Sequence, residues 1–442
     1  MFSGRDQHAR TSTHETVLDC LEAGIEAAHP SNVIPEKLTY DADQARLTIA
    51  GEPYDLSDIE SIYVVGGGNA AGAIARALES VLGDAIDAGA VVTDAPRDTQ
   101  SVETLAGDHP IPSERGVANT EAMKAIAADA GEHDLVLAII GGGGSALMAA
   151  PVDGVSLSAM QDVTDGLLRS GASIDEINAV RKHLSTIKGG QLARAAMPAR
   201  IVGLLFSDVV GDDPSVIASG PTVPDATTFE DALEVLDRYD VTVPEPVTAH
   251  LEAGSEGTVS ETPGPESDVF ARVTTHILAN GMTAIDAAAE TARDQGYTPL
   301  VLSARMRGEA RESALAHVAI AEECLASGQP VEPPAVLLSG GETTVTVRGD
   351  GTGGPNQEFA LSAGRELPGS VVLGGVDTDG LDGSTDAAGA LVDADTVENA
   401  DAATDALEAN DAYPFLDRRD ALLFSGETGT NVNDLRVVAV RK

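Results

Sequence analysis

The sequence predicts an α/β protein with two α/β domains, the first built on a parallel sheet of the Rossmann type. Short, continuous apolar runs alternate with alanine-rich stretches of helical spacing, and each run ends in glycine or a polar residue. Continuous apolar strands that alternate with helices are typical of parallel sheets covered on both faces. This pattern is interrupted by a stretch rich in Pro, Gly, Ser and Glu, and then it starts again. The interruption predicts a boundary between two domains.

The first domain is expected to span residues 1–245. Its predicted strands are the apolar runs at 61–65, 89–93, 134–140 and 200–206, and a helix is predicted over 69–82. Ligands of parallel sheets bind beyond the carboxyl ends of the strands, so the segments that follow these runs are the first candidates for a site.

The stretch 246–268 is predicted to be a linker or a surface excursion, and the second α/β domain is expected over 269–442. A strand followed by a helix is predicted over 276–296, a further strand over 297–305 and a helix over 313–327, and the pattern continues in segments 335–349, 370–383 and 421–440. Segment 340–347 alternates apolar and polar residues and is predicted to be a hairpin partner.

The composition bounds the function and the setting of the protein. With 71 Asp+Glu against 27 Lys+Arg, the formal net charge is −44, which argues against binding to nucleic acid or to an anionic membrane. An acid-rich, lysine-poor surface is typical of proteins from cells that keep molar salt in the cytoplasm, where screening is strong; an ordinary acidic protein is the alternative. Cys20 and Cys324 form no metal-binding motif and fit a reducing compartment. We therefore expect a cytoplasmic protein, monomeric or homodimeric, with small-molecule substrates.

The first glycine loop comprises Gly66, Gly67, Gly68 and Asn69 and matches G-x-G-x-x-A between a strand and a helix. Main-chain N–H groups at such a helix start attract anions. Asp94, at the end of the next predicted strand, lies where a dinucleotide site needs a ribose-binding acid. The alternative is a tight turn that needs small residues only for packing.

A second loop holds four consecutive glycines and a serine, and its candidate phosphate-binding residues are Gly142, Gly143, Gly144 and Ser145. Packing alone seldom requires four glycines, whereas a close main-chain approach to an anion does. Ser145 either donates to that anion or merely caps the following helix. The loop lacks the G-x-S-x-G pattern of a serine nucleophile.

A cluster of positive charge follows in the segment 178–190, which contains Arg181, Lys182, His183 and Lys188. Arg181, Ser185 and Lys188 would share one face of a helix. In so acidic a chain, Arg181 and Lys188 are candidates to neutralise a transferred phosphoryl group. Ion pairs within the protein are the alternative.

Carboxylates follow the predicted strand at 200–206, where Asp208 comes two residues after its end. Mg²⁺ binds through one or two carboxylates while phosphates and water fill its other positions, so Asp208 is the candidate metal ligand. Formation of a turn is the alternative for the neighbouring Asp, Gly and Pro residues.

The second half of the chain contains polar, turn-rich segments that together suggest the second wall of an interdomain cleft. Their candidates are Glu342 and Asn356 for nucleotide binding and Asp379 and Asp382 for catalysis. Motifs of P-loop proteins, zincins and thiol-redox proteins are absent.

Nine of these segments occur in the order in which one known family has them, including GGGNAAGAIA, GGGGSAL, INAVRKHLSTIKGG, SGGETTVTV, GGPNQEFAL and TGTNVNDL. In this respect the chain resembles the MOFRL family of glycerate 2-kinases from about residue 15 onward. The resemblance implies phosphorylation of D-glycerate to 2-phosphoglycerate with ATP and Mg²⁺, two α/β domains and an active site in the cleft between them.

The chain departs from the family pattern at two positions. Asn69 stands where the family usually has a lysine, and Pro355 stands where it usually has an arginine. Either the cations of segment 178–190 take over the missing charges, or the activity has changed. Two other hypotheses therefore stay open: an NAD(P)-dependent reductase of a hydroxypyruvate-like acid, and a sugar-acid-binding protein that has lost catalysis.

Overall fold

The computed structural model describes all 442 residues, which form two compact units. The central unit comprises Val33–Leu278, and the terminal unit comprises Met1–Asn32 together with Ala279–Lys442. This division differs from the expected boundaries near residues 245 and 268, because the N-terminal helix packs within the terminal unit and the chain passes from one unit to the other after β9. No helix combines the length and the apolar composition that crossing a membrane requires.

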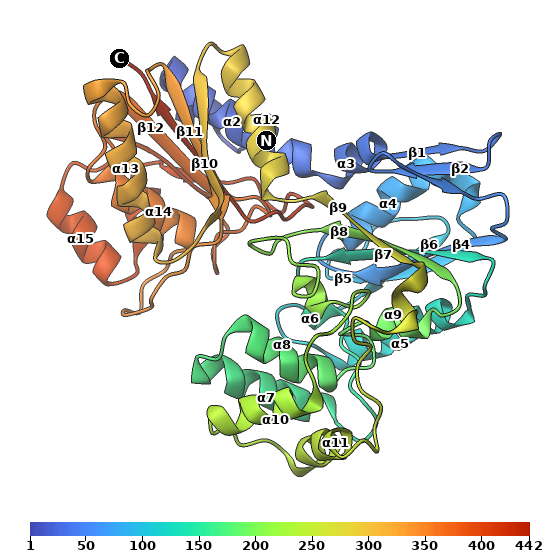
Figure 1. The fold of residues 1–442 in the computed structure, drawn as a ribbon. Helices are drawn as coiled ribbons and strands as arrows, with labels where there is room; N and C mark the ends of the chain where they lie inside the picture. The colour runs from blue at the N-terminus through green and yellow to red at the C-terminus, as the bar shows by residue number, and fades with distance from the viewer. The chain divides into compact units, whose positions relative to one another are not determined.

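A six-stranded sheet forms the core of the central unit (Figure 1). Its strands, in spatial order, are β6 (Val102–Ala106), β5 (Ala88–Thr93), β4 (Ser61–Gly67), β7 (Asp134–Gly141), β8 (Arg200–Phe206) and β9 (Val273–Ala279). The first five pair in parallel. The four strands that the sequence predicted here are therefore confirmed, and so is the α/β class.

Helices cover both faces of this sheet, as the continuous apolar strands require. In Figure 1, α4 lies on one side, and α5 and α9 lie on the other. The bounds are α4 (Ala71–Leu82), α5 (Glu114–Asp129) and α9 (Gln191–Ala195). Two further features were not predicted: helix α3 (Pro30–Lys37) and the small antiparallel sheet formed by β1 (Leu38–Asp41), β2 (Arg46–Ile49) and β3 (Glu52–Asp55).

A helical layer continues the central unit beyond the carboxyl ends of its strands. It consists of α6 (Gly144–Leu147), α7 (Leu157–Ser170), α8 (Ile174–His183), α10 (Phe229–Arg238) and α11 (Glu245–Ser255). Residues 246–268 were expected to form a linker, but they begin inside α11. Val247 and Leu251, one turn apart, are fully buried in an apolar cluster with α10, and this packing holds the segment as a helix.

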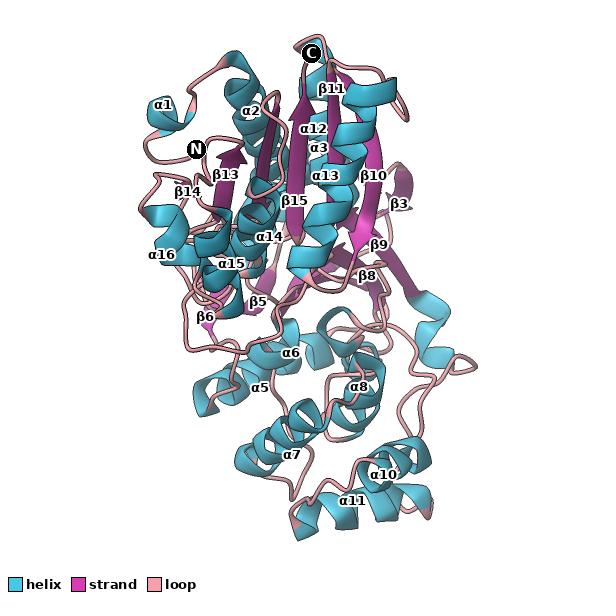
Figure 2. Ribbon diagram, turned by 90° about the vertical axis from the view of Figure 1, so that its left-hand side faces the viewer, coloured by secondary structure: helices cyan, strands magenta, loops and turns pink.

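The terminal unit contains a mixed sheet (Figure 2). Its spatial order is β10 (Thr298–Met306), β11 (Ala335–Gly341), β15 (Asp434–Val440), β12 (Val371–Asp377), β13 (Gly389–Asp393) and β14 (Leu422–Leu423). Only β10 and β11 are parallel to each other. Segment 340–347 forms no hairpin: β11 ends at Gly341, and its two edges are already paired with β10 and β15.

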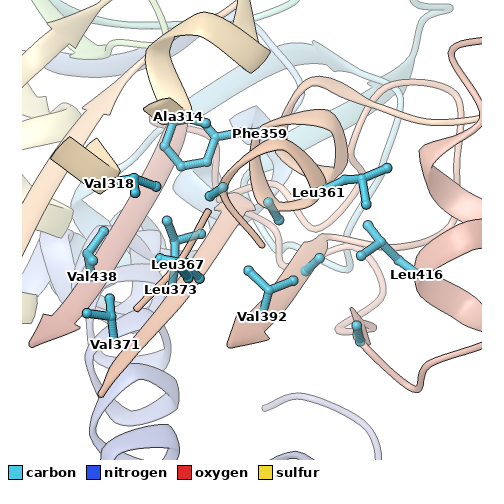
Figure 3. Close-up of a cluster of buried hydrophobic side chains, with 14 of the residues drawn as sticks. Ala314, Val318, Phe359, Leu361, Leu367, Val371, Leu373, Val392, Leu416 and Val438 are labelled. Carbon is cyan, nitrogen blue, oxygen red and sulfur yellow. The ribbon is translucent and has the colours of Figure 1, made fainter. Parts of the chain in front are cut away.

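The two faces of the terminal sheet carry different helices. One face holds α2 (Ser12–Ala28) and α12 (Gly281–Asp294), and the other holds α13 (Ala310–Ser327) and α14 (Pro355–Gly364), as Figures 1 and 2 show. The remaining helices are α1 (Arg5–His8), α15 (Ala400–Glu408) and α16 (Ala412–Asp417). The core between the sheet and α14 is apolar, with Phe359, Leu373 and Val438 fully buried (Figure 3).

Helix α2 belongs to this unit because of close packing. A Cβ added to Gly24 would lie 2.4 Å from a side-chain atom of Leu435 on β15 and 2.9 Å from the carbonyl oxygen of Ala284 on α12. Only glycine allows the three elements to approach so closely. Leu18 and Leu21 on the same helix are fully buried.

Candidate functional site

The loop that follows β7 is the centre of the candidate site in the central unit. The N–H groups of Gly143, Gly144 and Ser145 have no acceptor within the protein. Three successive unpaired N–H groups in a loop that contains a left-handed residue, Gly143 at φ 72°, form an arrangement that binds anions. This geometry favours the anion interpretation of the glycine run over a purely structural one.

Two side chains, from the segments that follow β4 and β8, occupy the space that a Cβ on Gly142 or Gly143 would need. A Cβ on Gly142 would lie 2.0 Å from Oδ2 of Asp208, and one on Gly143 would lie 1.6 Å from Oδ1 of Asn69. The structure thus brings together the ends of β4, β7 and β8, as a parallel sheet requires. Asp208 and Asn69, both sequence candidates, lie beside the loop.

Packing explains two of the glycines in the first loop. A Cβ on Gly66 would lie 1.9 Å from the carbonyl oxygen of Ile139, and one on Gly68 would lie 2.9 Å from main-chain atoms of Gly141. The alternative of a tight turn therefore accounts for Gly66 and Gly68 without a ligand.

Asn69 connects three strand ends. Its main-chain N–H donates to the carbonyl oxygen of Gly142 (2.9 Å), and its Nδ2 donates to Oδ2 of Asp94 (2.8 Å). Its Oδ1 is buried and has no partner. Asp94 therefore accepts a hydrogen bond from Asn69 instead of standing alone as a ribose-binding acid.

The predicted helical face of Arg181, Ser185 and Lys188 does not form. Helix α8 ends at His183, and Ser185 accepts hydrogen bonds from the N–H groups of Ile187 and Lys188 in the turn that follows. Local hydrogen bonding by a serine competes with helix formation in this way. Lys188 therefore lies beyond the helix.

Lys188 is buried and contacts main-chain carbonyl oxygens of the glycine loop and of the segment after it. Its Nζ donates to the carbonyl oxygens of Ser145 (2.7 Å) and Met148 (3.3 Å), and its side chain is 2% exposed. Burial, together with the nearby positive charge of Arg181, lowers the pKa of Lys188 to about 7. Lys188 thus holds the loop in place, and its amine is occupied by protein carbonyls.

The other cations of this segment differ in their partners. Lys182 pairs with buried Asp225 (3.2 Å), as the ion-pair alternative expects, and a ring nitrogen of His183 lies within hydrogen-bonding distance of Glu261 (2.7 Å). Half-buried Arg181 forms no hydrogen bond or ion pair with the protein. Burial lowers its pKa, and no carboxylate compensates for that burial. A half-buried, unpaired guanidinium in a chain of net charge −44 is the feature that an anionic ligand would explain.

Ser219 also contacts the loop, Asn178 contacts Ser219, and the sequence analysis predicted no role in the loop for either residue. The hydroxyl groups of Ser145 and Ser219 are 2.6 Å apart, and Ser219 donates to Oδ1 of Asn178 (2.9 Å). Ala218 and Ser219 have positive φ angles, which no sequence pattern indicates. The contact of Ser219 with the loop could therefore be found only in the structure.

In the terminal unit, Asp382 caps helix α14. Its Oδ1 accepts from the N–H of Asn356 (2.9 Å), and its Oδ2 accepts from the N–H of Gln357 (2.8 Å). Asp382 is 1% exposed, and burial raises its pKa to about 7 despite these bonds. Both oxygens are occupied, so its position is that of a structural cap and not of an accessible base.

Asn356, predicted to bind nucleotide, is fully buried and is held by two carboxylates. Its Nδ2 donates to Oδ1 of Asp434 (2.6 Å) and of Asp382 (3.3 Å). Asp434 also pairs with Arg436, whose side chain is fully buried and stacks on the ring of Phe359 at 4.7 Å. This network lies inside the unit and leaves Asn356 no free donor.

Asp379 is less enclosed than Asp382. Its Oδ1 accepts from the N–H of Leu381 (2.8 Å), and burial raises its pKa. Burial and the charges of Asp379 and Asp434 also raise the pKa of Asp377. Partial burial and the charge of Asp434 likewise raise the pKa of Glu342. Of the two carboxylates predicted to be catalytic in this unit, Asp379 is the more exposed.

Neither unit holds a ready-made metal cage. No group of three or more His, Cys, Asp or Glu side chains is placed to hold a metal ion. Mg²⁺ requires fewer protein ligands, because phosphates and water complete its shell. The carboxylate of Asp208 lies beside Gly142 of the anion-binding loop, so the donor type and position fit Mg²⁺ bound together with phosphate.

Family models match most of the chain. Residues 16–252 match the model described as a domain of unknown function, DUF4147, and residues 335–434 match the MOFRL family. A glycerate 2-kinase of Pyrococcus horikoshii is 39% identical over 94% of each chain. The D-glycerate 2-kinase of Thermotoga maritima is 38% identical over 96% of this chain and 97% of its own. The chain belongs to the MOFRL glycerate kinase family.

A solved structure agrees with this membership. The glycerate kinase of T. maritima superimposes with a TM-score of 0.84 at 37% identity, covering 96% of this chain and 99% of the other. One further member, from Agrobacterium vitis, is 42% identical over 85% of this chain and 86% of its own, and is named provisionally as a hydroxypyruvate reductase.

Proposed function

We propose that this glycerate kinase family member transfers the γ-phosphoryl group of ATP to the 2-hydroxyl of D-glycerate, giving 2-phosphoglycerate and ADP. The observation that carries the proposal is its similarity to proteins named glycerate 2-kinase over nearly the whole of both chains. The central unit adds a loop with three unpaired N–H groups, and an unpaired arginine near Lys188, which itself contacts that loop; both features suit a polyphosphate.

The ATP phosphates would lie on the N–H groups of Gly143, Gly144 and Ser145, with Arg181 as the neutralising cation. Phosphoryl transfer depends mainly on positioning and on stabilising spread negative charge. Arg181 is suited to that role because no protein carboxylate competes for its guanidinium.

Asp208 would hold Mg²⁺, which when bound neutralises charge on the phosphates. Asp379 would orient the 2-hydroxyl of glycerate or accept its proton. Burial raises the pKa of Asp379, which makes its carboxylate a better proton acceptor than an exposed one. Lys188 and Asp382, predicted to be catalytic, would act through the loop and through helix α14 respectively.

The test is an assay of ADP release with D-glycerate and ATP at low and at multimolar KCl. The product is identified as 2- or 3-phosphoglycerate. We expect 2-phosphoglycerate, and faster turnover in high salt if the charge of −44 reflects a salt-rich cytoplasm. Formation of 3-phosphoglycerate would contradict the proposed position of transfer. Binding of glycerate without ADP release would favour a protein that has lost catalysis.

A reductase acting on a hydroxypyruvate-like acid is the second candidate function. Its support is the G-x-G-x-x-A loop with Asp94 at the next strand end, together with the name of the A. vitis relative. Because Asp94 already accepts a hydrogen bond from Asn69, its carboxylate has less capacity to accept hydrogen bonds from the hydroxyl groups of a ribose. Loss of nicotinamide absorbance on adding hydroxypyruvate, with no ADP release from the kinase mixture, would favour the reductase.

A further inference from the structure

We propose that Ser219, held by Asn178, is a positioning residue that orients the hydroxyl of Ser145 in the phosphate-binding loop. The inference rests on the proposed kinase function and adds two residues to it. Neither residue reaches the loop surface, since Ser219 is fully buried and Asn178 is 3% exposed.

The contacts form a chain of three side chains. The hydroxyl oxygens of Ser145 and Ser219 are 2.6 Å apart, and the Ser219 hydroxyl is 2.9 Å from Oδ1 of Asn178. A carbonyl oxygen only accepts, so the single proton of Ser219 is used on Asn178. Ser145 then donates to Ser219 and turns its lone pairs toward the loop.

Because Nδ2 of Asn178 is unpaired, the hydrogen bonds of this chain can also run in the opposite direction. This buried donor has no partner in the structure. If the amide turns over, Nδ2 donates to Ser219, Ser219 donates to Ser145, and the Ser145 proton faces the loop. A phosphate on the loop N–H groups would select this second direction, because it gains one more donor.

The backbone at Ser219 shows that the position is maintained against strain. Ala218 and Ser219 have φ angles of 49° and 61°, in the left-handed region that residues with a side chain rarely adopt. Glycine would adopt this conformation freely, and Gly220 follows directly. The hydroxyl is what a serine adds at this position.

Ser145 is consequently fixed from two sides. Lys188 holds its carbonyl oxygen at 2.7 Å, and Ser219 holds its hydroxyl. Both contacts set the direction of the unpaired N–H groups of the loop. Loss of the Ser219 hydroxyl should therefore weaken phosphate binding, although Ser219 itself touches no ligand.

The experiment compares wild type, Ser219→Gly, Ser145→Ala and the double variant. Ser219→Gly removes the hydroxyl, which leaves Oδ1 of Asn178 without its donor, and it also relieves the backbone strain. Because these two effects on stability oppose each other, we expect little change in the melting temperature while KM for ATP rises about 3- to 10-fold. A residue with only a structural role would not combine these two results. Asp240→Gly is the matched control, since Asp240 is an exposed residue with φ 49° at the end of α10.

The double variant tests whether Ser219 acts through Ser145. If it does, Ser219→Gly has no further effect on KM for ATP in the Ser145→Ala background. Effects that multiply, or an unchanged KM in Ser219→Gly, would overturn the inference. If the wild type shows no kinase turnover, the proposed function fails. Calorimetric titration of the same four proteins with ATP then decides the inference on its own, through the dissociation constant.

Discussion

The amine of Lys188 donates a 2.7 Å hydrogen bond to the main-chain carbonyl oxygen of Ser145. This bond assigns Lys188 to the support of the glycine loop, since the same amine also reaches the carbonyl of Met148. A lysine that faced the phosphates would leave these two carbonyls without their donor.

Replacing Lys188 by Met should disturb the loop without removing a phosphate ligand. Two buried carbonyls lose their donor, and each such loss costs about 1–3 kcal/mol. We expect a lower melting temperature together with a raised KM for ATP in the ADP-release assay. Lys124→Met is the control, because Lys124 bonds to Thr186 (2.9 Å) outside the loop. Equal effects of the two substitutions on KM would contradict the prediction.

The depressed pKa of Lys188 predicts how stability varies with pH. The amine has a pKa of about 7 in the folded protein, against a reference near 10.5. Between these values the unfolded chain binds a proton that the folded protein lacks, so stability rises with pH by up to about 1.4 kcal/mol per unit. The free energy of unfolding of wild type relative to Lys188→Met should therefore increase from pH 7 to pH 10. A difference that stays constant, measured by urea unfolding, would contradict the shifted pKa.

Replacing Arg181 by Met should separate activity from stability. No ion pair is lost, and the desolvation of a half-buried charge is relieved, so the melting temperature should stay the same or rise. We expect kcat/KM for ATP to fall about 100-fold, the effect of removing one charge-stabilising donor. Near-normal turnover would exclude Arg181 from the site.

Replacing Arg436 by Met should lower the stability of the protein, in contrast to the replacement of Arg181. Its substitution by Met leaves Asp434 buried without its cation, and breaking a buried pair costs about 3–5 kcal/mol. The double variant Arg436→Met with Asp434→Asn should recover much of that loss in urea unfolding, because no buried charge is left unpaired. Failure of the double variant to recover would assign the loss to the packing of Arg436 on Phe359.

The sequence predicted the parallel strands well because their signal is local. A run such as 134–140 is apolar from Leu135 to Ile140 and is followed by glycine, and a strand buried on both faces requires a continuous apolar composition. Helix α11 was missed because its apolar residues, Val247 and Leu251, are few among Pro, Gly and Glu, and only contact with α10 fixes it. The unit boundary was missed for a related reason, since nothing near residue 20 indicates a partner beyond residue 280.

The candidate site was predicted in part. Arg181, Asp208 and the loop Gly142–Ser145 follow strands or stand out by charge, and the structure gathers them in one unit. Residue types alone did not distinguish Lys182, paired with Asp225, from unpaired Arg181. The partners lie tens of residues away, so the distinction between a structural and a functional cation comes only from the fold. Likewise, the capping bonds of Asp382 show a role that the turn-rich sequence around it did not.

Helix α2 is synthesised about 400 residues before β15, on which it packs. At about 5–20 residues per second, the apolar face of α2 stays without its native partner for tens of seconds. The apolar face of α2 therefore stays unpacked while the whole central unit is synthesised.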